Sequence, residues 1–353
     1  YLRGAWSIYV SFSTLLDEVN PASVVVFNGM SYPEAVARWM ARQRGIRVVT
    51  HEVCLKPFSA FFSSGDATLR SIHIPADFEL NQEQNAQLDA YLEQRFKGNF
   101  KMAGVKFWSG MDQLDEGFMN KAAGFKQIVP VFANVIFDTS QAHANVIFEH
   151  MFAWLDAVKE IIRQHPETLF VLRAHPDEAR PGKESRESVA DWVKKNDLES
   201  YANVVFVDSK ERISSYDLIR RSKFVMVYNS TIGLEASLMG APVLCAGRSR
   251  FTDYPTVFFP ADREGFLQKA QEFLTGEAID VPPIFRQNAR RYLYYELYRA
   301  SLAFDDFLEE DKYWQGYVTL KDFTWEDLLP ENSDVMKTFY EGIVLDKPFL
   351  IEE

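Results

Sequence analysis

The chain of 353 residues contains only two cysteines, and its 50 acidic side chains outnumber its 38 basic ones. Cys54 and Cys245 provide neither a disulfide framework nor the Cys/His spacing of a zinc site, a pattern typical of a reducing compartment. The formal net charge of −12 argues against binding to duplex nucleic acid, which depends on basic side chains that neutralise phosphates. We therefore expect no nucleic-acid partner.

Long apolar segments are missing as well. No run of 18 or more apolar residues occurs, so a membrane-spanning helix is not predicted. A signal peptide is not recognised either. The sequence starts at Tyr1, without an initiator Met and inside an apparent helix, so we expect the natural N-terminus to lie upstream.

Several motifs of well-known catalytic sites are also absent. The sequence has no G-x-G-x-x-G after a predicted strand, no G-x-x-x-x-G-K-[ST] phosphate loop and no G-x-S-x-G nucleophile elbow. Its six histidines lack the spacing of metal ligands, and no D-x-D pair stands out. These kinds of site are therefore not predicted.

The residues that are present suit a globular α/β protein. Hydrophobic residues make up 47% of the chain and aromatic residues 14%, enough to build cores and to line a binding cleft. Strand, helix and strand joined by short connections indicate a parallel βαβ unit near the start. The elements predicted there are helix 1–18, strand 24–27, helix 32–44 and strand 46–50.

A second run of alternating strands and helices follows a polar, helical stretch at 76–124. Its continuous Val, Leu and Phe segments are typical of strands buried on both faces. The predicted strands are 127–135, 169–173, 204–207, 224–228 and 242–246. The predicted helices are 143–165, 188–195, 216–221 and 231–239.

These patterns predict an α/β fold of two facing Rossmann-like domains with a helical C-terminal segment. The N-terminal domain, including its helical insertion, is predicted to span 1–125, and the second domain 126–280. The segment 281–353 is helical and aromatic, and we expect this tail to pack back on the N-terminal domain.

Open parallel sheets bind ligands beyond the carboxyl ends of their strands. One such end carries Asn229, Ser230 and Thr231, and the helix that follows contains Gly233 and Glu235. Free N–H groups, the helix dipole and the two hydroxyls suit a phosphate, Gly233 permits a close approach, and Glu235 is placed for a ribose diol. The alternative is that Ser230 only caps the helix and that Glu235 is solvated.

A second strand ends at Arg173, and His175 follows it, immediately before Pro176. Both side chains can donate hydrogen bonds to a phosphate or pyrophosphate. A lone histidine at a strand end is also a common structural feature. Its coincidence with Ser230 at another strand end favours a binding role.

The segment from Arg173-Ala174-His175-Pro176 to the run S-T-I-G-L-E-A-S-L-M-G-A-P-V, which begins at Ser230, resembles the donor half of GT-B glycosyltransferases. It is most similar to the bacterial capsule polysaccharide biosynthesis family, which includes transferases for the acidic sugar Kdo. In that family an H-P pair and an S-T-x-x-x-E-A-x-x-x-G-x-P-V block line the nucleotide-sugar cleft. The resemblance covers about 128–260, is weaker over 20–75 and does not extend into the tail.

The resemblance implies a metal-independent glycosyltransferase that moves a sugar from a nucleotide-sugar to a surface or capsular glycan or glycolipid. The donor would be CMP-Kdo or a UDP- or GDP-sugar, and no separate cofactor is implied. The expected location is the cytoplasm, including the inner face of the membrane, in association with other glycan-assembly proteins. A nucleotide-sugar epimerase of similar fold and an inactive nucleotide- or sugar-binding protein stay open as alternatives.

An inverting transferase also needs a carboxylate or histidine close to the acceptor hydroxyl. Glu52 follows the strand 46–50 and is predicted to point into the cleft as the base, with His51 orienting it or replacing it. The alternative is that Glu52 pairs with Arg47. Asp138, at the end of the strand 127–135, is the second candidate for the base.

Overall fold

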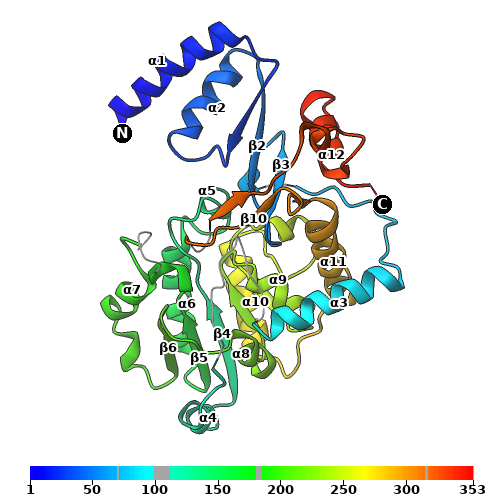
Figure 1. Ribbon diagram of the computed structural model, residues 1–353. Helices are drawn as coiled ribbons and strands as arrows, with labels where there is room; N and C mark the ends of the chain where they lie inside the picture. Colours follow the sequence, from blue (N-terminus) through cyan, green and yellow to red (C-terminus); the bar gives the residue numbers. More distant parts are fainter. Residues whose placement is uncertain (70, 99–111, 180–184, 315–316, 353) are drawn as a thin grey trace. The chain divides into compact units, whose positions relative to one another are not determined.

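The computed structural model describes residues 1–69, 71–98, 112–179, 185–314 and 317–352 (Figure 1). The described residues form two compact units. Those within 1–95 and 293–352 make up unit 1, and those within 96–98 and 112–292 make up unit 2.

Unit 2 is built on a parallel sheet with the strand order β6-β5-β4-β7-β8. Every residue of β5, β7 and β8 is buried, as expected for strands covered on both faces, so their apolar runs show no alternation. The strands are β4 (Gln127–Phe132), β5 (Thr168–Arg173), β6 (Val204–Val207), β7 (Val225–Val227) and β8 (Val243–Cys245).

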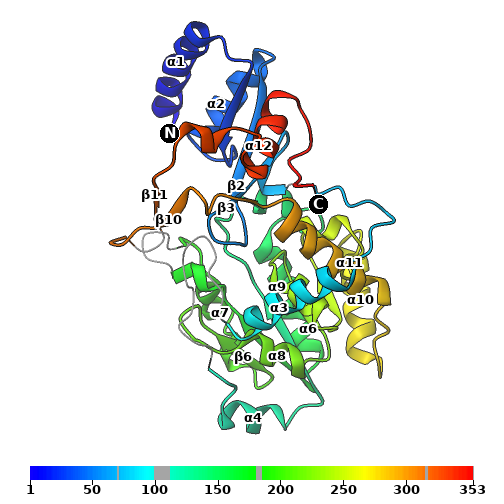
Figure 2. The same cartoon turned by 45° about the vertical axis from the view of Figure 1, so that its right-hand side comes forward.

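Helices cover both faces of this sheet (Figures 1 and 2). Trp154 of α6 and Phe266 of α10 belong to the larger core on one face, and Phe118 of α4 and Leu218 of α8 pack on the other. The helices of unit 2 are α4 (Glu116–Ala122), α5 (Gln141–Ala144), α6 (Met151–Gln164), α7 (Val189–Lys195), α8 (Ser215–Arg221), α9 (Ile232–Leu238) and α10 (Arg263–Thr275). Single turns are η2 (Pro176–Ala179), η3 (Leu198–Ser200) and η4 (Arg250–Asp253), and α11 (Pro283–Tyr294) continues into unit 1.

Unit 1 contains a smaller, mixed sheet with the order β1-β2-β3-β9. The predicted βαβ unit is present, since β1 and β2 are parallel and α2 connects them. Strand β3 then pairs antiparallel with β2, and β9 pairs antiparallel with β3. The elements are α1 (Leu2–Val19), β1 (Ser23–Phe27), α2 (Glu34–Gln43), β2 (Arg47–Val53), β3 (Ser59–Ser63), η1 (Ala67–Leu69) and α3 (Gln82–Phe96). From the C-terminal segment come η5 (Tyr295–Arg299), β9 (Leu302–Ala303), β10 (Leu308–Glu310), β11 (Val318–Leu320), η6 (Trp325–Leu328) and α12 (Asp334–Val344).

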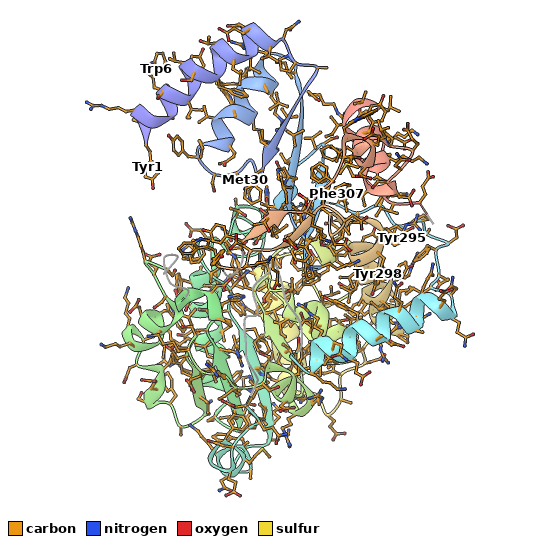
Figure 3. All side chains as sticks on the ribbon, viewed as in Figure 1. Tyr1, Trp6, Met30, Tyr295, Tyr298 and Phe307 are labelled. Carbon is orange, nitrogen blue, oxygen red and sulfur yellow. The ribbon has the colours of Figure 1, made fainter. Side chains whose placement is uncertain are left out.

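The two faces of the unit 1 sheet are covered by different parts of the chain. On one face, Ala41 of α2 packs against Val26 and Val48. On the other face, Phe62 of β3 packs with aromatic and aliphatic residues of the C-terminal segment, which include Phe339 and Phe349. Helix α1 contacts α2, and its Trp6 projects into solvent (Figure 3).

Several predicted boundaries differ from the structure. The helix expected over 143–165 begins at Met151, because His150 takes an extended conformation and its Nδ1 accepts the Ala153 N–H at 3.0 Å. Histidine is not among the usual N-cap residues, so this helix start could not be recognised from the residue type. The strand 59–63 was not predicted at all. Within the predicted polar stretch 76–124, residues 99–111 lie outside the described residues.

The compact units also divide the chain differently from the predicted domain ranges. Described residues between 112 and 125 group with unit 2, and so do residues 281–292. The C-terminal segment contains the two-stranded ribbon β10-β11 as well as its helices. Among the described helices, none is both long and apolar enough to cross a membrane.

Candidate functional site

The strand order of unit 2 reverses between β4 and β7, and helices leave these two strands toward opposite faces of the sheet. Asn134, His175 and Asn229 are each the second residue after a strand, namely β4, β5 and β7. Parallel pairing of these strands brings their carboxyl ends to one edge of the sheet. This edge is the candidate site.

Asn229 is held by three side chains at this edge. Its Oδ1 accepts hydrogen bonds from Asn134 Nδ2 at 2.7 Å and from Gln141 Nε2 at 3.1 Å, and its Nδ2 donates to Ser140 Oγ at 3.0 Å. The three amide side chains are 5–8% exposed, which is unusual for polar groups unless they are hydrogen-bonded. The sequence analysis assigned Asn229 to the nucleotide, whereas the structure shows its amide bonded within the protein.

Asp138 lies in the connection that follows β4 and forms a tight turn with the residues after it. Its Oδ1 accepts the Ser140 N–H at 2.8 Å, and its main-chain carbonyl accepts the Gln141 N–H at 2.9 Å. His175 follows β5, the parallel neighbour of the strand that precedes Asp138. Burial lowers the pKa of His175, and the negative charge of Asp138 acts against this larger effect.

His175 follows β5 and is half-buried. Burial is the main influence on its pKa and lowers it, while the charges of Asp177 and Asp138 act upward and that of Arg173 downward. The Asp177 N–H donates to His175 Nδ1 at 3.2 Å. A ring nitrogen that accepts carries no proton, so the neutral imidazole holds its proton on Nε2.

Arg173 is the last residue of β5 and is 6% exposed. Burial lowers its pKa to about 10, with the charge of Glu211 opposing the shift, so the guanidinium stays charged at neutral pH. One of its N–H groups donates to the carbonyl of Ile213. The side chain therefore brings a fixed positive charge to the same edge as His175.

Ser230 and Thr231 lead into α9, a helix of only seven residues. Among the described contacts, the side chain of Thr231, the residue at the N-cap, does not cap the helix. Gly233 is buried, and a Cβ there would lie 3.0 Å from Val227 Cγ2 and 3.4 Å from Phe251 Cζ. Its missing side chain therefore allows α9 to pack against β7, rather than leaving space for a ligand as predicted.

Glu235 is 6% exposed, and its Oε2 accepts the hydroxyl hydrogen of Tyr216 at 2.6 Å. The alternative that Glu235 is solvated is therefore wrong. Tyr216, in α8, has no local signal that distinguishes it from a core aromatic, so the sequence analysis missed it. The pair joins α8 to α9 and holds one carboxylate oxygen in place.

The other two candidate residues belong to unit 1. Both were expected beyond a strand end, but β2 continues to Val53, and His51 and Glu52 pair with β3 inside the strand. Glu52 accepts hydrogen bonds from Asn28 Nδ2 at 2.6 Å and from the Val53 N–H at 3.0 Å. His51 stacks on Phe62, and burial lowers its pKa while the charge of Glu52 opposes the shift.

The alternative of a Glu52–Arg47 ion pair is wrong. Side chains alternate along a strand, so residues 47 and 52 project from opposite faces of β2. The Arg47 guanidinium donates to the carbonyls of Gly342 and Ile343 and forms an ion pair with Asp346 at 2.5 Å.

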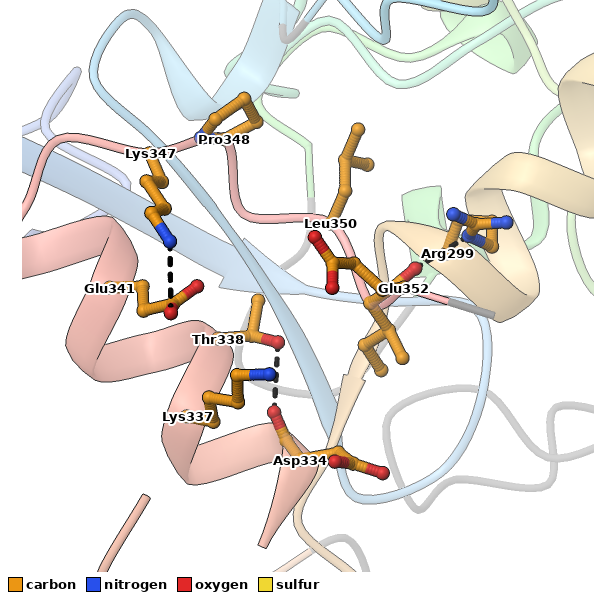
Figure 4. Close-up of a pocket in the computed structure, with 10 residues that line it drawn as sticks. Arg299, Asp334, Lys337, Thr338, Glu341, Lys347, Pro348, Leu350 and Glu352 are labelled. Atoms are coloured by element: carbon orange, nitrogen blue, oxygen red, sulfur yellow. Dashed lines mark hydrogen bonds and ion pairs between the residues drawn. The ribbon is translucent and has the colours of Figure 1, made fainter. Parts of the chain in front are cut away.

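A groove of about 260 Å³ lies in unit 1 between α12 and the segment that follows it (Figure 4). Its charged lining is balanced, since Arg299, Lys337 and Lys347 alternate with three carboxylates. Lys347 is paired with Glu341 at 3.0 Å, and Arg299 Nε donates to the carbonyl of Ile351 at 2.5 Å. These contacts tie the C-terminal segment together.

Residues 118–254 match the family model described as capsule polysaccharide biosynthesis protein. The resemblance stated from the sequence is therefore confirmed over this part of the chain, which contains β4 to β8 and the whole candidate edge. A comparison with curated proteins gave no match.

Among solved structures, the chain is similar to KpsC, the beta Kdo 2,4 transferase of Thermosulfurimonas dismutans, with a TM-score of 0.52 and 11% identity over 79% of this chain and 80% of that one. The beta Kdo 2,7 transferase KpsC of the same organism matches with a TM-score of 0.44 and 14% identity over 95% and 89%. A UDP-GlcNAc 2-epimerase from Neisseria meningitidis, bound to UDP-GlcNAc, gives a TM-score of 0.33 and 14% identity over 83% and 80%. The first of these matches confirms the predicted fold class, an α/β protein with two Rossmann-like domains.

Proposed function

We propose that this chain is a glycosyltransferase that binds a nucleotide-sugar at the carboxyl edge of the unit 2 sheet. The observation that carries the proposal is the position of Arg173, His175, Asp138 and Ser230 at or after the carboxyl ends of the adjacent strands β5, β4 and β7. The strand order reverses between β4 and β7, and all four residues lie within the segment that matches the capsule polysaccharide biosynthesis family. The acceptor is a surface or capsular glycan or glycolipid.

In this proposal the donor phosphate lies against His175 and Arg173. His175 donates from Nε2, since its Nδ1 already accepts the Asp177 N–H. Arg173 adds a positive charge that persists at neutral pH because its pKa is about 10. These groups stabilise the negative charge that develops on the leaving phosphate, without a requirement for a metal ion. Ser230 and Thr231 add hydroxyl donors, and Glu235 accepts from the ribose.

A panel of CMP-Kdo, UDP-sugars and GDP-sugars, incubated with and without a glycan acceptor, tests the proposal. Acceptor-dependent transfer from one donor supports it. Epimerisation of a donor without an acceptor identifies an epimerase instead, and binding without either reaction identifies a binding protein. The proposal is wrong if calorimetry detects no binding of any donor in the panel.

The variant His175→Ala extends the same experiment to the site itself. A hydrogen bond to a charged group contributes about 1.5–3 kcal/mol, so donor affinity should fall by about 10- to 150-fold. His150→Ala is the matched control, because His150 is exposed and caps α6. Equal donor affinity in the wild type and His175→Ala would remove His175 from the site.

A further inference from the structure

The buried amides of Asn134, Gln141 and Asn229 are arranged in one fixed orientation. Asn134 Oδ1 accepts the Val135 N–H at 2.8 Å, so its NH₂ group must point toward Asn229. Asn229 must then present its oxygen to Asn134 and Gln141, and its own NH₂ group to Ser140. If the Asn229 amide were flipped, its NH₂ group would face the NH₂ groups of Asn134 and Gln141, and no hydrogen bond could form. The hydrogen bonds themselves therefore determine the orientation.

A buried network of this kind is a less safe way to stabilise a fold than apolar packing. A buried amide that loses its partner costs about 1–3 kcal/mol, and apolar side chains of the same shape avoid that risk. Three buried amide side chains, each 5–8% exposed, lie at one edge of the sheet. Their presence therefore indicates that they position another part of the site.

The group that they place is the turn at Asp138. Asn229 holds Ser140 through its hydroxyl, and the Ser140 N–H is bonded to Asp138 Oδ1. Gln141 is connected to the same turn by two hydrogen bonds. Its side chain donates to Asn229, and its main-chain N–H donates to the Asp138 carbonyl. The turn cannot swing without breaking these bonds.

We infer that Asn134, Gln141 and Asn229 form a clamp that holds Asp138 against His175, so that Asn134 and Gln141 are positioning residues of the donor site. The clamp joins the ends of β4 and β7, and Asp138 follows β4, the parallel neighbour of the strand that precedes His175. The role of this arrangement in catalysis rests on the proposed function, but the clamp itself is a property of the protein without ligand.

The clamp makes a prediction for the ionisation of His175, which is influenced by Asp177, Asp138 and Arg173. The Asp138→Asn variant removes one negative charge beside the imidazole, so the pKa of His175 should fall. If the clamp holds the turn, Gln141→Met should lower the pKa in the same direction, because Asp138 is then free to move away. Methionine has a similar length and shape but cannot donate to Asn229.

The measurement is the titration of His175 by NMR of the ¹³C-histidine-labelled full chain, with its signal assigned from His175→Ala. Gln127→Met is the matched control, since Gln127 also donates two side-chain bonds in unit 2, to Thr168 Oγ1 at 2.8 Å and to Leu274 O at 3.1 Å, but lies at the start of β4. It should leave the pKa of His175 unchanged. Ser140→Ala, which removes the hydroxyl between Asn229 and the turn, replaces Gln141→Met if the latter does not fold.

The inference is overturned if Asp138→Asn lowers the pKa of His175 while Gln141→Met and Ser140→Ala do not. It is also overturned if Asp138→Asn has no effect, because the carboxylate is then not beside the imidazole. The readout needs no substrate, so the two proposals fail separately. Shifted pKa values with no donor binding would contradict only the proposed function, and donor binding with unshifted values would contradict only the clamp.

Discussion

The carboxylate of Glu235 illustrates how one residue can fit two roles. Its Oε2 accepts from Tyr216, and both side chains are almost completely buried. A ribose diol and a tyrosine hydroxyl are both hydrogen-bond donors, so a carboxylate with two oxygens can bind one of each. Stability and donor affinity must therefore be measured separately.

If Glu235 contacts the ribose, Glu235→Ala should weaken donor binding by about 1.5–3 kcal/mol, the range for a hydrogen bond to a charged group. Tyr216→Phe is the matched control, because it removes the internal hydrogen bond and leaves the carboxylate. It should lower the Tm but keep most of the donor affinity measured by calorimetry. If Glu235→Ala lowers the Tm but leaves donor affinity unchanged, the role of Glu235 is structural only.

Two carboxylates are candidates for the general base. Glu52 is bonded to Asn28 in unit 1, and Asp138 lies in the connection that follows β4 in unit 2. Loss of a general base typically lowers kcat by about 10²–10⁴-fold, while donor affinity is kept. We expect this result for Glu52→Gln or for Asp138→Asn, measured by steady-state transfer kinetics. A Glu52→Gln enzyme with more than about a third of wild-type turnover would exclude Glu52, because loss of a base costs at least about tenfold.

At the scale of elements, Glu178 connects η2 to α7. Its two carboxylate oxygens accept the Val189 N–H at 3.0 and 3.2 Å, at the first residue of the helix. Burial raises its pKa to about 7 from an ordinary value of 4.5, and the charges of Asp208 and Asp191 act in the same direction. The folded protein therefore binds the proton more tightly than the unfolded chain does.

The sign of the pH dependence follows from linkage. The contribution of Glu178 to stability is fully present below pH 4.5 and is lost as the pH rises through about 7. Glu178→Gln keeps an acceptor for Val189 and removes the titration. Its Tm relative to wild type should therefore increase between pH 4.5 and 7 and then stay level, as measured by calorimetric scans. A difference in Tm between Glu178→Gln and wild type that stays constant over this pH range would contradict the assignment.

Helix α12 provides a second test at this scale. A Cβ on Gly342 would overlap the ring of Phe349, which belongs to the core between α12 and the sheet of unit 1. Alanine is better than glycine in a helix by about 1 kcal/mol, but overpacking costs about 1–3 kcal/mol. Gly342→Ala should therefore destabilise the protein in denaturant titrations. In α10, Gly265→Ala meets only ordinary contacts at 3.4 Å and 3.5 Å, and it should be neutral or stabilising.

At the scale of the whole molecule, the charge is strongly negative at −12, yet the proposed donor is an anion. The donor site must therefore supply local positive charge, which Arg173 does because its pKa of about 10 keeps it charged at neutral pH. If this charge and His175 serve the leaving phosphate, EDTA should leave the rate of transfer unchanged. Assays with EDTA, and with Mg²⁺ or Mn²⁺ added back, check this expectation, and restoration of a lost rate by either ion would contradict it.

The sequence was most informative where a signal is local. Continuous apolar runs and helical periodicity predicted β4 to β8 and the βαβ unit at β1, because burial on both faces of a strand and on one side of a helix leaves a pattern within ten or so residues. The same reasoning, applied to strand ends, proposed His175 and Asn229 as site residues, and the structure places both after strand ends at one edge of the sheet. It could have found Asn134 too, which is also the second residue after a strand.

The partners of these residues were decided by the tertiary structure alone. The chain folds back to pair β3 with β2, which places Glu52 inside the sheet, and Asn28, a residue 24 positions away, becomes its partner. Asn229 is bonded to side chains 88–95 positions away, so no local pattern could show that its amide is already satisfied. Residue type and spacing determine which chemistry a side chain can perform. The long-range pairing of strands and turns determines whether a side chain forms its hydrogen bonds within the protein or can offer them to a ligand.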